Sequence, residues 1–545
     1  MLKLLTLFGG LLAFTASASA QDPDKDRVVA GAGRVFDAVT KAYVAPGPGC
    51  AAGVSLNGET VFEKAFGLAE IEHGVPNTPQ TIFESGSVAK QFTAAALVLL
   101  QQEGKLRLED PVRKYIPELP DYGAPLTIRH LLTHTSGIRD WGTVMSLTGA
   151  GRGDRVITQA LALDVITHQR ALDFTPGSEY SYSNSGYNLA AIIVERVSTQ
   201  KFATFIAERL FKPIGMDHSS IRDDYRRIVP GRAEAYSRQG TGPWHLDMPF
   251  MNVYGNGGIL TTVGDWIKWN AMLDSKSLGA PLVAAMETRG VLNDGRKITY
   301  ALGLEVGTYK GLNYVQHGGS TAGYQTYLAR YPDKKVSVAV MCNGTSPDAA
   351  TITAAIADQI FGLPAYPPIG SAKVSDDELK AFVGLWRNEK THFPGRFVME
   401  TGVTRWNGGR LYPQGSGQFI GGNNVLKFAF DKDGKPVSVE SVDDDGVATH
   451  FIREHEWTPT PSDLASFKGD WSSDEAGATF TFAVDGSRAF LKQRPARSLV
   501  MQPLYKDHFT APGYVIWFTR DEGGTVDRMH IGAGRMRDMP FVRVK

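Results

Sequence analysis

A serine and a lysine one helical turn apart stand at the start of a long apolar run. Ser87 and Lys90 lie in ESGSVAKQFTAAALVLL, and the residues after them are apolar on almost every side of the expected helix. Residues three apart share a helical face, so the lysine amine can reach the serine hydroxyl. A helix N-terminus favours negative charge, and burial lowers the pKa of a lysine. The pattern therefore predicts an activated serine nucleophile with a lysine proton acceptor.

The spacing alone is a weak signal, because the chain contains it twice. Ser198 and Lys201 repeat it at the C-terminal end of a predicted helix, where the helix dipole has the wrong sign for an anion. We interpret that copy as solvent-exposed residues at a helix end. For Ser87, the alternative is an N-cap serine followed by an exposed lysine.

Two further motifs follow along the chain. Tyr182 to Asn184 reads Tyr-Ser-Asn just before a predicted helix, and His317 to Gly319 reads His-Gly-Gly on a predicted strand. A tyrosine among aromatics is ordinarily core packing, and a strand histidine is ordinarily structural. Tyr254 to Asn256 repeats the Tyr-x-Asn pattern, but only the copy at Tyr182 follows a Pro-Gly turn between the other two motifs.

The order Ser-x-x-Lys, Tyr-x-Asn, His-x-Gly resembles the serine penicillin-recognising superfamily. Its members include class C β-lactamases, low-molecular-weight penicillin-binding proteins, D-aminopeptidase and related serine esterases. The sequences HLLTHTSGI, FTPGSEYSYSN and GNGGILTTVGDWIKW provide matching context, and the resemblance covers residues 27–362.

This resemblance implies four catalytic residues. Ser87 would be the acylated nucleophile, Lys90 its proton partner, and Tyr182 a second general acid–base group. His317 would stand on the strand where most β-lactamases and penicillin-binding proteins have the lysine of Lys-Thr-Gly. Histidine carries a positive charge only partly near neutral pH, and a His-x-Gly strand resembles D-aminopeptidase and some esterases more than dedicated β-lactamases.

The resemblance also implies four substrate-binding residues. Asn184 would hydrogen-bond a substrate amide, while Gly318 and Gly319 would let the substrate backbone lie along their strand. The backbone N–H groups of Ser87 and Ser320 would form an oxyanion hole.

The elements around these motifs divide the chain into one large and two small units. Stretches rich in proline and small residues at 362–375 and 458–462 are typical of exposed connectors. In the large unit, a hairpin turning at Asn57-Gly58 comes first, three strands span 314–343, and helices are expected at 87–103, 128–132, 186–197 and 266–273 between them. This arrangement predicts one antiparallel sheet flanked by helices, an α/β or α+β unit, and not a doubly wound fold.

The two small units repeat each other. DELKAFVGLW and SDLASFKGDW share leucine, phenylalanine, glycine and tryptophan at one constant offset, and alternating strand patterns follow both. This duplication predicts two small antiparallel β-barrels of a lipocalin-like kind. Two barrels after a hydrolase unit also resemble D-aminopeptidase, although segment 509–514 contains no acidic residue that would hold a substrate amine. We expect a signal peptide at 1–20, a β-lactamase-like domain at 21–365, and barrels at 375–457 and 462–545.

The first residues and the overall charge bear on location. Lys3, an apolar run and small residues ending at Ala20 predict a cleavable signal peptide, since the run is shorter than the roughly 20 apolar residues that span a bilayer. We expect a periplasmic or secreted protein with no membrane span in its mature form. Lysine plus arginine equals aspartate plus glutamate at 57 each, which gives no reason to expect nucleic acid as a partner. The oligomeric state stays open.

Two cysteines occur, Cys50 and Cys342, too few for a disulfide framework and without metal-ligand spacing. If the last strand of the large unit pairs antiparallel with its first, these cysteines are neighbours. An exported pair can be oxidised, whereas strand neighbours also stay reduced when misaligned. A disulfide and two free thiols are both left open.

Taken together, the sequence predicts an exported serine hydrolase that acylates Ser87, without metal or cofactor. Neither a Gly-x-Ser-x-Gly elbow nor a His-Glu-x-x-His zinc motif is present. The expected substrates are small amides or short peptides containing D-amino acids, as for a D-aminopeptidase or a D-Ala carboxypeptidase. Alternatives are a carboxylesterase, a weak β-lactamase, and a non-catalytic protein that binds a partner or cell-wall glycan.

Overall fold

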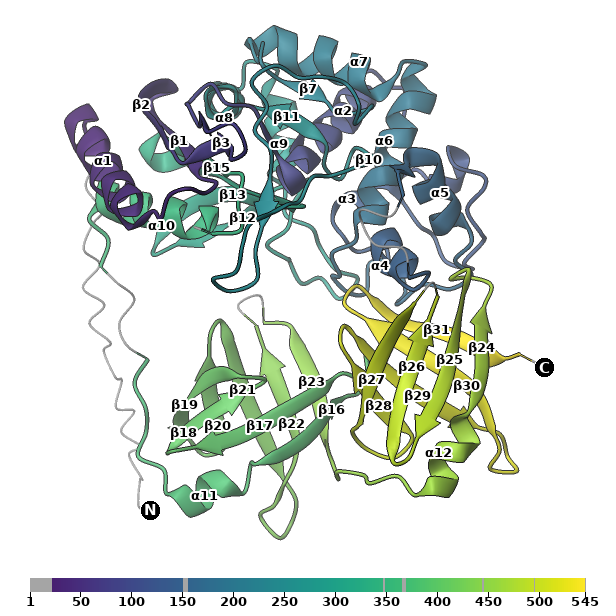
Figure 1. Ribbon diagram of the computed structural model, residues 1–545. Helices are drawn as coiled ribbons and strands as arrows, with labels where there is room; N and C mark the ends of the chain where they lie inside the picture. Colours follow the sequence, from purple (N-terminus) through teal and green to yellow (C-terminus); the bar gives the residue numbers. More distant parts are fainter. Residues whose placement is uncertain are drawn as a thin grey trace, which may run out of the picture.

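A computed structural model describes residues 22–149, 155–346, 348–364, 369–443, 446–494 and 496–544. The signal peptide expected at 1–20 lies outside these residues. A large α/β unit occupies the upper part of Figure 1, and two β-barrels lie side by side beneath it. The predicted fold class is confirmed.

The large unit is built on a six-stranded antiparallel sheet in the order β12-β13-β14-β15-β1-β2. Its strands are β1 (Cys50–Leu56), β2 (Glu59–Phe66), β12 (Glu305–Tyr309), β13 (Leu312–Thr321), β14 (Tyr324–Tyr331) and β15 (Val336–Cys342). The first and last of these strands in the chain, β1 and β15, pair inside the sheet, which is the arrangement that would make the two cysteines neighbours. The predicted hairpin is also confirmed, because Asn57 and Gly58 both have positive φ, as a two-residue type I′ turn requires.

Helices cover both faces of this sheet. The helices of the unit are α1 (Lys25–Ala42), α2 (Lys90–Gln102), α3 (Ile128–Leu132), α4 (Trp141–Ser146), α5 (Gln159–Thr167), α6 (Asn184–Ser198), α7 (Phe202–Ile206), α8 (Val263–Ser275), α9 (Ala280–Met286) and α10 (Ala349–Phe361). Alternate residues of β1 belong to different cores: Ala52 packs with α1 and α10, and Ala51 packs with α2 and α8. A strand buried on both faces explains why β1 is apolar except for Ser55.

Short strands connect the helical layer to the sheet. A three-stranded sheet has the order β5-β11-β7, from β5 (Phe83–Glu84), β11 (Ile259–Thr261) and β7 (Ser220–Ile221). Two-stranded sheets pair β3 (Leu68–Glu70) with β4 (Val75–Pro76), β6 (Ile157–Thr158) with β10 (Met251–Asn252), and β8 (Tyr236–Ser237) with β9 (His245–Leu246). Most of the expected helices are found with small shifts at their ends; the helix expected at 87–103 begins with a 3-10 turn, Gly86–Ala89, before α2.

The two small units are closed eight-stranded barrels. The first consists of β16 (Gly384–Asn388), β17 (Pro394–Glu400), β18 (Val403–Trp406), β19 (Gly409–Gly415), β20 (Gln418–Gly421), β21 (Asn424–Phe430), β22 (Pro436–Val442) and β23 (Ala448–Glu454), preceded by α11 (Asp376–Lys380). The second consists of β24 (Gly469–Ser473), β25 (Ala478–Asp485), β26 (Arg488–Gln493), β27 (Arg497–Pro503), β28 (His508–Ala511), β29 (Tyr514–Arg520), β30 (Val526–Ala533) and β31 (Met536–Arg543), preceded by α12 (Pro461–Phe467).

The two barrels repeat even in their tryptophans. Trp386 and Trp471 are both fully buried, and each indole N–H donates to the backbone carbonyl four residues earlier, that of Phe382 or Phe467. The matched sequence positions therefore hold equivalent places in the two barrels. The exact domain boundaries expected from the sequence stay a prediction.

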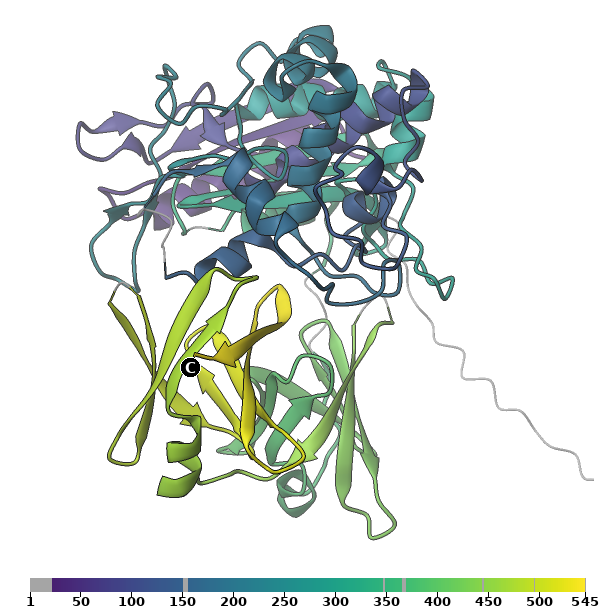
Figure 2. The same cartoon turned by 90° about the vertical axis from the view of Figure 1, so that its right-hand side faces the viewer.

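The second barrel packs against the large unit below α4 (Figure 2). Val144 and Leu147 from the large unit lie in the hydrophobic cluster that forms the core of this barrel. The amide of Gln493 donates to the carbonyl of Leu147 over 2.6 Å, and buried Arg139 forms an ion pair with Glu475 at 2.9 Å. These contacts hold the second barrel against α4 and the residues on either side of it.

Cys50 and Cys342 are paired directly across β1 and β15, and they form a disulfide. This bond joins the first and last strands of the large unit. Within the described ranges, no helix combines the length and apolar character needed to cross a membrane.

The disulfide gives a first prediction. Unfolding without reductant should expose no free thiol, and reduction should lower the free energy of unfolding by about 2–4 kcal/mol, because the bond closes a long loop in the unfolded chain. Guanidinium unfolding with and without reductant, together with thiol titration, measures both. The variant Cys50→Ala/Cys342→Ala is the control and should not respond to reductant; two titratable thiols in the unreduced wild type would contradict the bond.

Candidate active site

The turn that carries Ser87 is held by hydrogen bonds to β11 and β14. The backbone N–H of Ser85 donates to the carbonyl of Ile259 at 2.8 Å, and the hydroxyl of Thr326 donates to the carbonyl of Ser85 at 2.8 Å. Ser87 follows in the 3-10 turn, half-buried, at the N-terminal end of α2. The sequence-predicted position at a helix N-terminus is therefore found.

Two glycines allow this turn to lie against β13. A Cβ atom on Gly86, which has φ of +51°, would come within 2.5 Å of the backbone nitrogen of Ser320. A Cβ atom on Gly319 would come within 2.1 Å of the carbonyl oxygen of Ser85. Because neither approach leaves room for a side chain, these glycines let the amide of Ser320 lie beside the turn that holds Ser87.

A buried ionic cluster anchors the strand before the turn. Glu84 is fully buried and accepts two hydrogen bonds from the guanidinium of Arg222, at 2.8 and 2.9 Å. Arg232 donates to the same carboxylate at 3.1 Å. A bidentate pair fixes the orientation as well as the position of the carboxylate, so the backbone entering the Ser87 turn is tightly held.

Lys90 is fully buried among three oxygen atoms. Its Nζ lies 3.0 Å from the Oγ of Ser87, 3.0 Å from the Oδ1 of Asn184 and 2.8 Å from the carbonyl oxygen of Asn256. Among the described residues, no carboxylate forms an ion pair with this amine.

Burial keeps the pKa of Lys90 well below its usual range, and the positive charge of Arg535 acts in the same direction. A neutral amine has two N–H groups and one lone pair. The carbonyl oxygens of Asn184 and Asn256 can only accept, so they take the two N–H groups. The lone pair then faces the hydroxyl of Ser87, which is the arrangement of a general base and its nucleophile.

Tyr182 lies beside the same two groups. Its ring centroid is 4.8 Å from the Nζ of Lys90 and 4.0 Å from the imidazole centroid of His134. Burial raises the pKa of its hydroxyl, whereas the hydrogen bond to Ser87 and the charge of Arg535 act in the opposite direction. The hydroxyl is thus protonated at rest and able to donate to a group that reacts at Ser87.

Asn184 begins α6 and is oriented from both sides. Its backbone N–H donates to the Oδ2 of Asp140 at 2.8 Å, and its side-chain oxygen faces Lys90. The other oxygen of Asp140 caps α4 by accepting the N–H of Thr143 at 3.1 Å. One buried carboxylate therefore ties the start of α6 to the start of α4.

His317 lies on β13 as predicted, but it is buried and neutral. Its Nδ1 donates to the carbonyl of Gly318 at 2.6 Å, and its Nε2 then accepts from the hydroxyl of Tyr300 at 2.9 Å. Burial, reinforced by the nearby Lys90, lowers the pKa of the imidazole to about 3. This position of β13 therefore carries no charge near neutral pH.

These groups border a cavity of about 1200 Å³ that lies between the large unit and the second barrel. Ser87, Tyr182, Asn184 and residues 316–321 line one side. Turns of the second barrel line another, at residues 512–514 and 533–535. All eight predicted site residues lie together here, counting Lys90, which is buried directly behind Ser87.

Several residues at the site were not identified from the sequence. Asn256 belongs to the Tyr-x-Asn copy that was set aside, yet its carbonyl accepts from Lys90. His134 lies in HLLTHTSGI, which served only as context, and it stacks on Tyr182. Arg535 had no sequence signal, because only the packing of the second barrel brings it to the cavity. The second Ser-x-x-Lys behaves as expected for Lys201, which is exposed, although Ser198 is half-buried.

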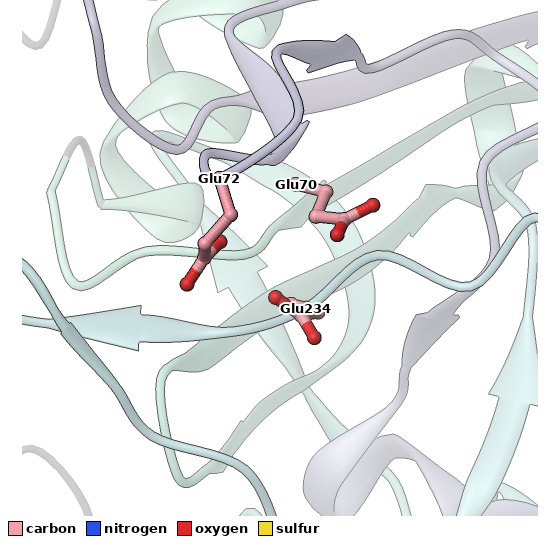
Figure 3. Close-up of side chains that lie close together, drawn as sticks. All are labelled: Glu70, Glu72 and Glu234. Atoms are coloured by element: carbon pink, nitrogen blue, oxygen red, sulfur yellow. The ribbon is translucent and has the colours of Figure 1, made fainter.

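A group of acidic side chains lies elsewhere in the large unit. Glu70, Glu72 and Glu234 have carboxylate oxygens within 4.8 Å of one another (Figure 3). The hydroxyl oxygen of Tyr236 lies 2.7 Å from a carboxylate oxygen of Glu72 and 2.8 Å from one of Glu234, and its single proton is shared between them. This tyrosine accounts for the approach of two of the carboxylates, and the group is not among the residues that line the cavity.

The Beta-lactamase family model matches residues 36–361. A D-aminopeptidase of Gluconobacter oxydans is 27% identical over 531 residues, which cover 92% of this chain and 96% of that protein. Penicillin-binding protein 4* of Bacillus subtilis is 30% identical over 307 residues, which cover 52% of this chain and 66% of that protein.

The octameric penicillin-binding protein homologue from Pyrococcus abyssi has a similar solved structure. It superposes with a TM-score of 0.54 and 23% identity, covering 86% of this chain and 99% of that one. At this identity the likeness concerns the fold, and it extends beyond the large unit.

The close contact at Gly86 gives a second prediction. Gly86→Ala should slow covalent labelling of Ser87 by a fluorophosphonate about 10²-fold, because the new methyl group would push the amide of Ser320 away from Ser87. Gly104→Ala is the matched control: Gly104 also has positive φ, +70°, but no atom lies within 4 Å of the added Cβ. It should lose about 1 kcal/mol of stability and keep its labelling rate. Equal labelling of both variants would contradict the role of this contact.

Proposed function

Since this chain belongs to the Beta-lactamase family, we propose that it hydrolyses small amides or short peptides through an acyl-enzyme on Ser87. The chain is a serine hydrolase by family, and the assignment of individual residues is our proposal. The observation that carries it is the environment of Lys90: a buried amine whose two carbonyl neighbours leave its lone pair for the hydroxyl of Ser87.

Acylation proceeds by proton transfer from Ser87 to Lys90. As the Oγ of Ser87 bonds to the substrate carbonyl carbon, its proton moves to the Nζ of Lys90 and the carbonyl electrons move to oxygen. The backbone N–H groups of Ser87 and Ser320 stabilise that oxyanion. When the bond to the leaving group breaks, Tyr182 donates a proton to it and is reprotonated by Lys90.

Deacylation uses the same groups in reverse. A water molecule attacks the ester carbon, and its proton passes to the Tyr182–Lys90 pair. Collapse of the second tetrahedral intermediate releases the acid and returns a proton to the Oγ of Ser87. Asn184, Gly318 and Gly319 hold the substrate, with its backbone along β13. The neutral His317 fixes the local shape of that strand through its bond with Tyr300.

The similarity to known proteins favours substrates that contain D-amino acids. The full-length likeness to a D-aminopeptidase includes both barrels, and a penicillin-binding protein matches the large unit. A D-aminopeptidase and a D-Ala carboxypeptidase are therefore the leading candidates. Carboxylesterase and weak β-lactamase activities use the same acylation step and remain alternatives. A non-catalytic binding protein on this scaffold is the alternative from another class.

Export is part of the proposal. The basic, apolar and small-residue segments within residues 1–20 favour a cleaved signal peptide. The disulfide between Cys50 and Cys342 supports it, because disulfides persist in oxidising compartments. A periplasmic or secreted location satisfies both observations.

Substitution of the proposed catalytic residues gives a third prediction. Ser87→Ala should abolish fluorophosphonate labelling, and Lys90→Ala and Tyr182→Phe should each slow acylation about 10²–10⁴-fold while the fold remains. Ser198→Ala and Lys201→Ala, in the second Ser-x-x-Lys, are matched controls that should label normally. Labelling that persists in Ser87→Ala, or normal turnover in Lys90→Ala or Tyr182→Phe, would refute the mechanism. A wild-type protein that takes no label would favour the non-catalytic binding protein.

A substrate panel gives a fourth prediction. The panel contains D- and L-alanine amides, acetyl-D-alanyl-D-alanine, a p-nitrophenyl ester and a cephalosporin. We expect at least about tenfold higher kcat/KM for D-amino acid compounds than for their L-forms, a difference of about 1.4 kcal/mol in transition-state binding. Hydrolysis of the ester alone would identify a carboxylesterase, and preference for the cephalosporin a β-lactamase.

A further inference from the structure

Arg535 brings a partly exposed positive charge from the second barrel to the cavity. It lies in the turn between β30 and β31, its side chain is 47% exposed, and its guanidinium carbon is 4.5 Å from the ring centroid of Tyr182. Arg535 and Ser87 both line the cavity, so a substrate bound there can reach both. Within the described part of the chain, the guanidinium donates no hydrogen bond, and its one ion pair is a long one with Asp140, at 3.9 Å.

The carboxylates that line the cavity are engaged by other donors. Asp140 accepts from the N–H groups of Asn184 and Thr143. Glu305 accepts from the amide of Gln316, and Asp348 accepts from the N–H and hydroxyl of Thr351. Each of these acids therefore accepts at least one hydrogen bond, whereas the five N–H donors of Arg535 form no hydrogen bond with the described residues.

The position on β13 that the sequence comparison matches to the lysine of Lys-Thr-Gly provides no cation in this protein. His317 is buried, and both of its ring nitrogens are occupied by Gly318 and Tyr300. Lys90 is enclosed behind Ser87 and has no face toward the cavity. Among the described residues that line the cavity, the charged cations are thus Arg535, which contacts Tyr182, and Arg497 on β27.

We propose that Arg535 forms an anion-binding subsite for a substrate carboxylate, so that the preferred amides or peptides carry a negative charge near the bond that is cleaved. This inference rests on the proposed function and narrows its substrate class. A guanidinium binds a carboxylate through two parallel N–H···O hydrogen bonds. A substrate ammonium has no oxygen to accept these bonds, and its positive charge is repelled by the guanidinium. The second barrel therefore selects against substrates with a free amine at this place and in favour of acidic ones.

Arg535 is not needed to hold the barrel in place. Besides its side-chain contacts with Tyr182 and Asp140, Arg535 contacts the large unit through its backbone carbonyl, which accepts the N–H of Asp140 at 3.2 Å whatever the side chain. Other side chains form closer ion pairs across the interface: Arg139 with Glu475 at 2.9 Å, and Arg537 with Glu179 at 3.0 Å. Arg537, which lies two residues further along the chain on β31, is therefore the matched control.

The test measures binding in the full chain with Ser87→Ala, so that nothing is turned over. Acetyl-D-alanyl-D-alanine is compared with its C-terminal amide, and succinyl-D-alaninamide with acetyl-D-alaninamide, by calorimetry at low salt. In one of the two pairs, we expect the ligand with the carboxylate to bind about 10–100-fold more tightly than its neutral counterpart. The pair that shows the difference reveals whether Arg535 faces the leaving group or the acyl group.

Two arginine variants complete the experiment. Arg535→Gln should remove the preference for the carboxylate without changing the binding of the neutral ligand, and Arg535→Lys should keep part of it. Arg537→Gln should leave the preference intact even if it lowers the unfolding temperature. Equal binding of both members of each pair by the parent protein, or an unchanged preference in Arg535→Gln, would overturn the inference. Failure of Ser87 to label in the wild type is a separate result that bears on catalysis alone.

Discussion

The site depends on one constraint, the burial of an amine without a countercharge. Lys90 has three oxygen neighbours, and no carboxylate of the described residues forms an ion pair with it, so its ammonium form is costly and its neutral form is favoured. The rest of the site maintains this condition. Because Gly86 and Gly319 have no side chains, β13 can lie close to the turn that contains Ser87. The ion pairs of Glu84 fix the backbone just before this turn. A carboxylate next to Lys90 would restore its charge and remove its lone pair.

The second barrel contributes to this electrostatic balance. Arg535 lowers the pKa of Lys90 and opposes the rise in the pKa of Tyr182, so a residue far away in sequence adjusts both proposed proton carriers. Asp140 opposes the effect of Arg535 on Lys90, because its carboxylate raises the pKa of Lys90. The same carboxylate accepts the backbone N–H of Asn184. Removal of the barrel would therefore change the chemistry of the site as well as its shape.

Sequence patterns predicted the fold and most of the site because they report local physics. The Asn57-Gly58 turn and the repeated tryptophans each depend on neighbours in the chain, and each was found. The motifs at 87, 182 and 317 carried the site. What the sequence did not reveal depends on tertiary packing: the carbonyl of Asn256 uses a backbone atom that any residue has, and Arg535 arrives with a separate unit. The neutral state of His317 follows from burial, which its motif does not specify.

The pairing of the first and last strands of the large unit affects how the chain folds. β1 and β15 are both interior strands of the sheet, and the cysteines that join them are 292 residues apart. This pair of strands cannot form until nearly all of this unit has been synthesised, and closing so large a loop makes folding slow. In the interval β1 is an apolar strand with no partner on one edge, exposed to aggregation. A chain with this order of strands is therefore suited to being kept unfolded after synthesis and folded in one step later.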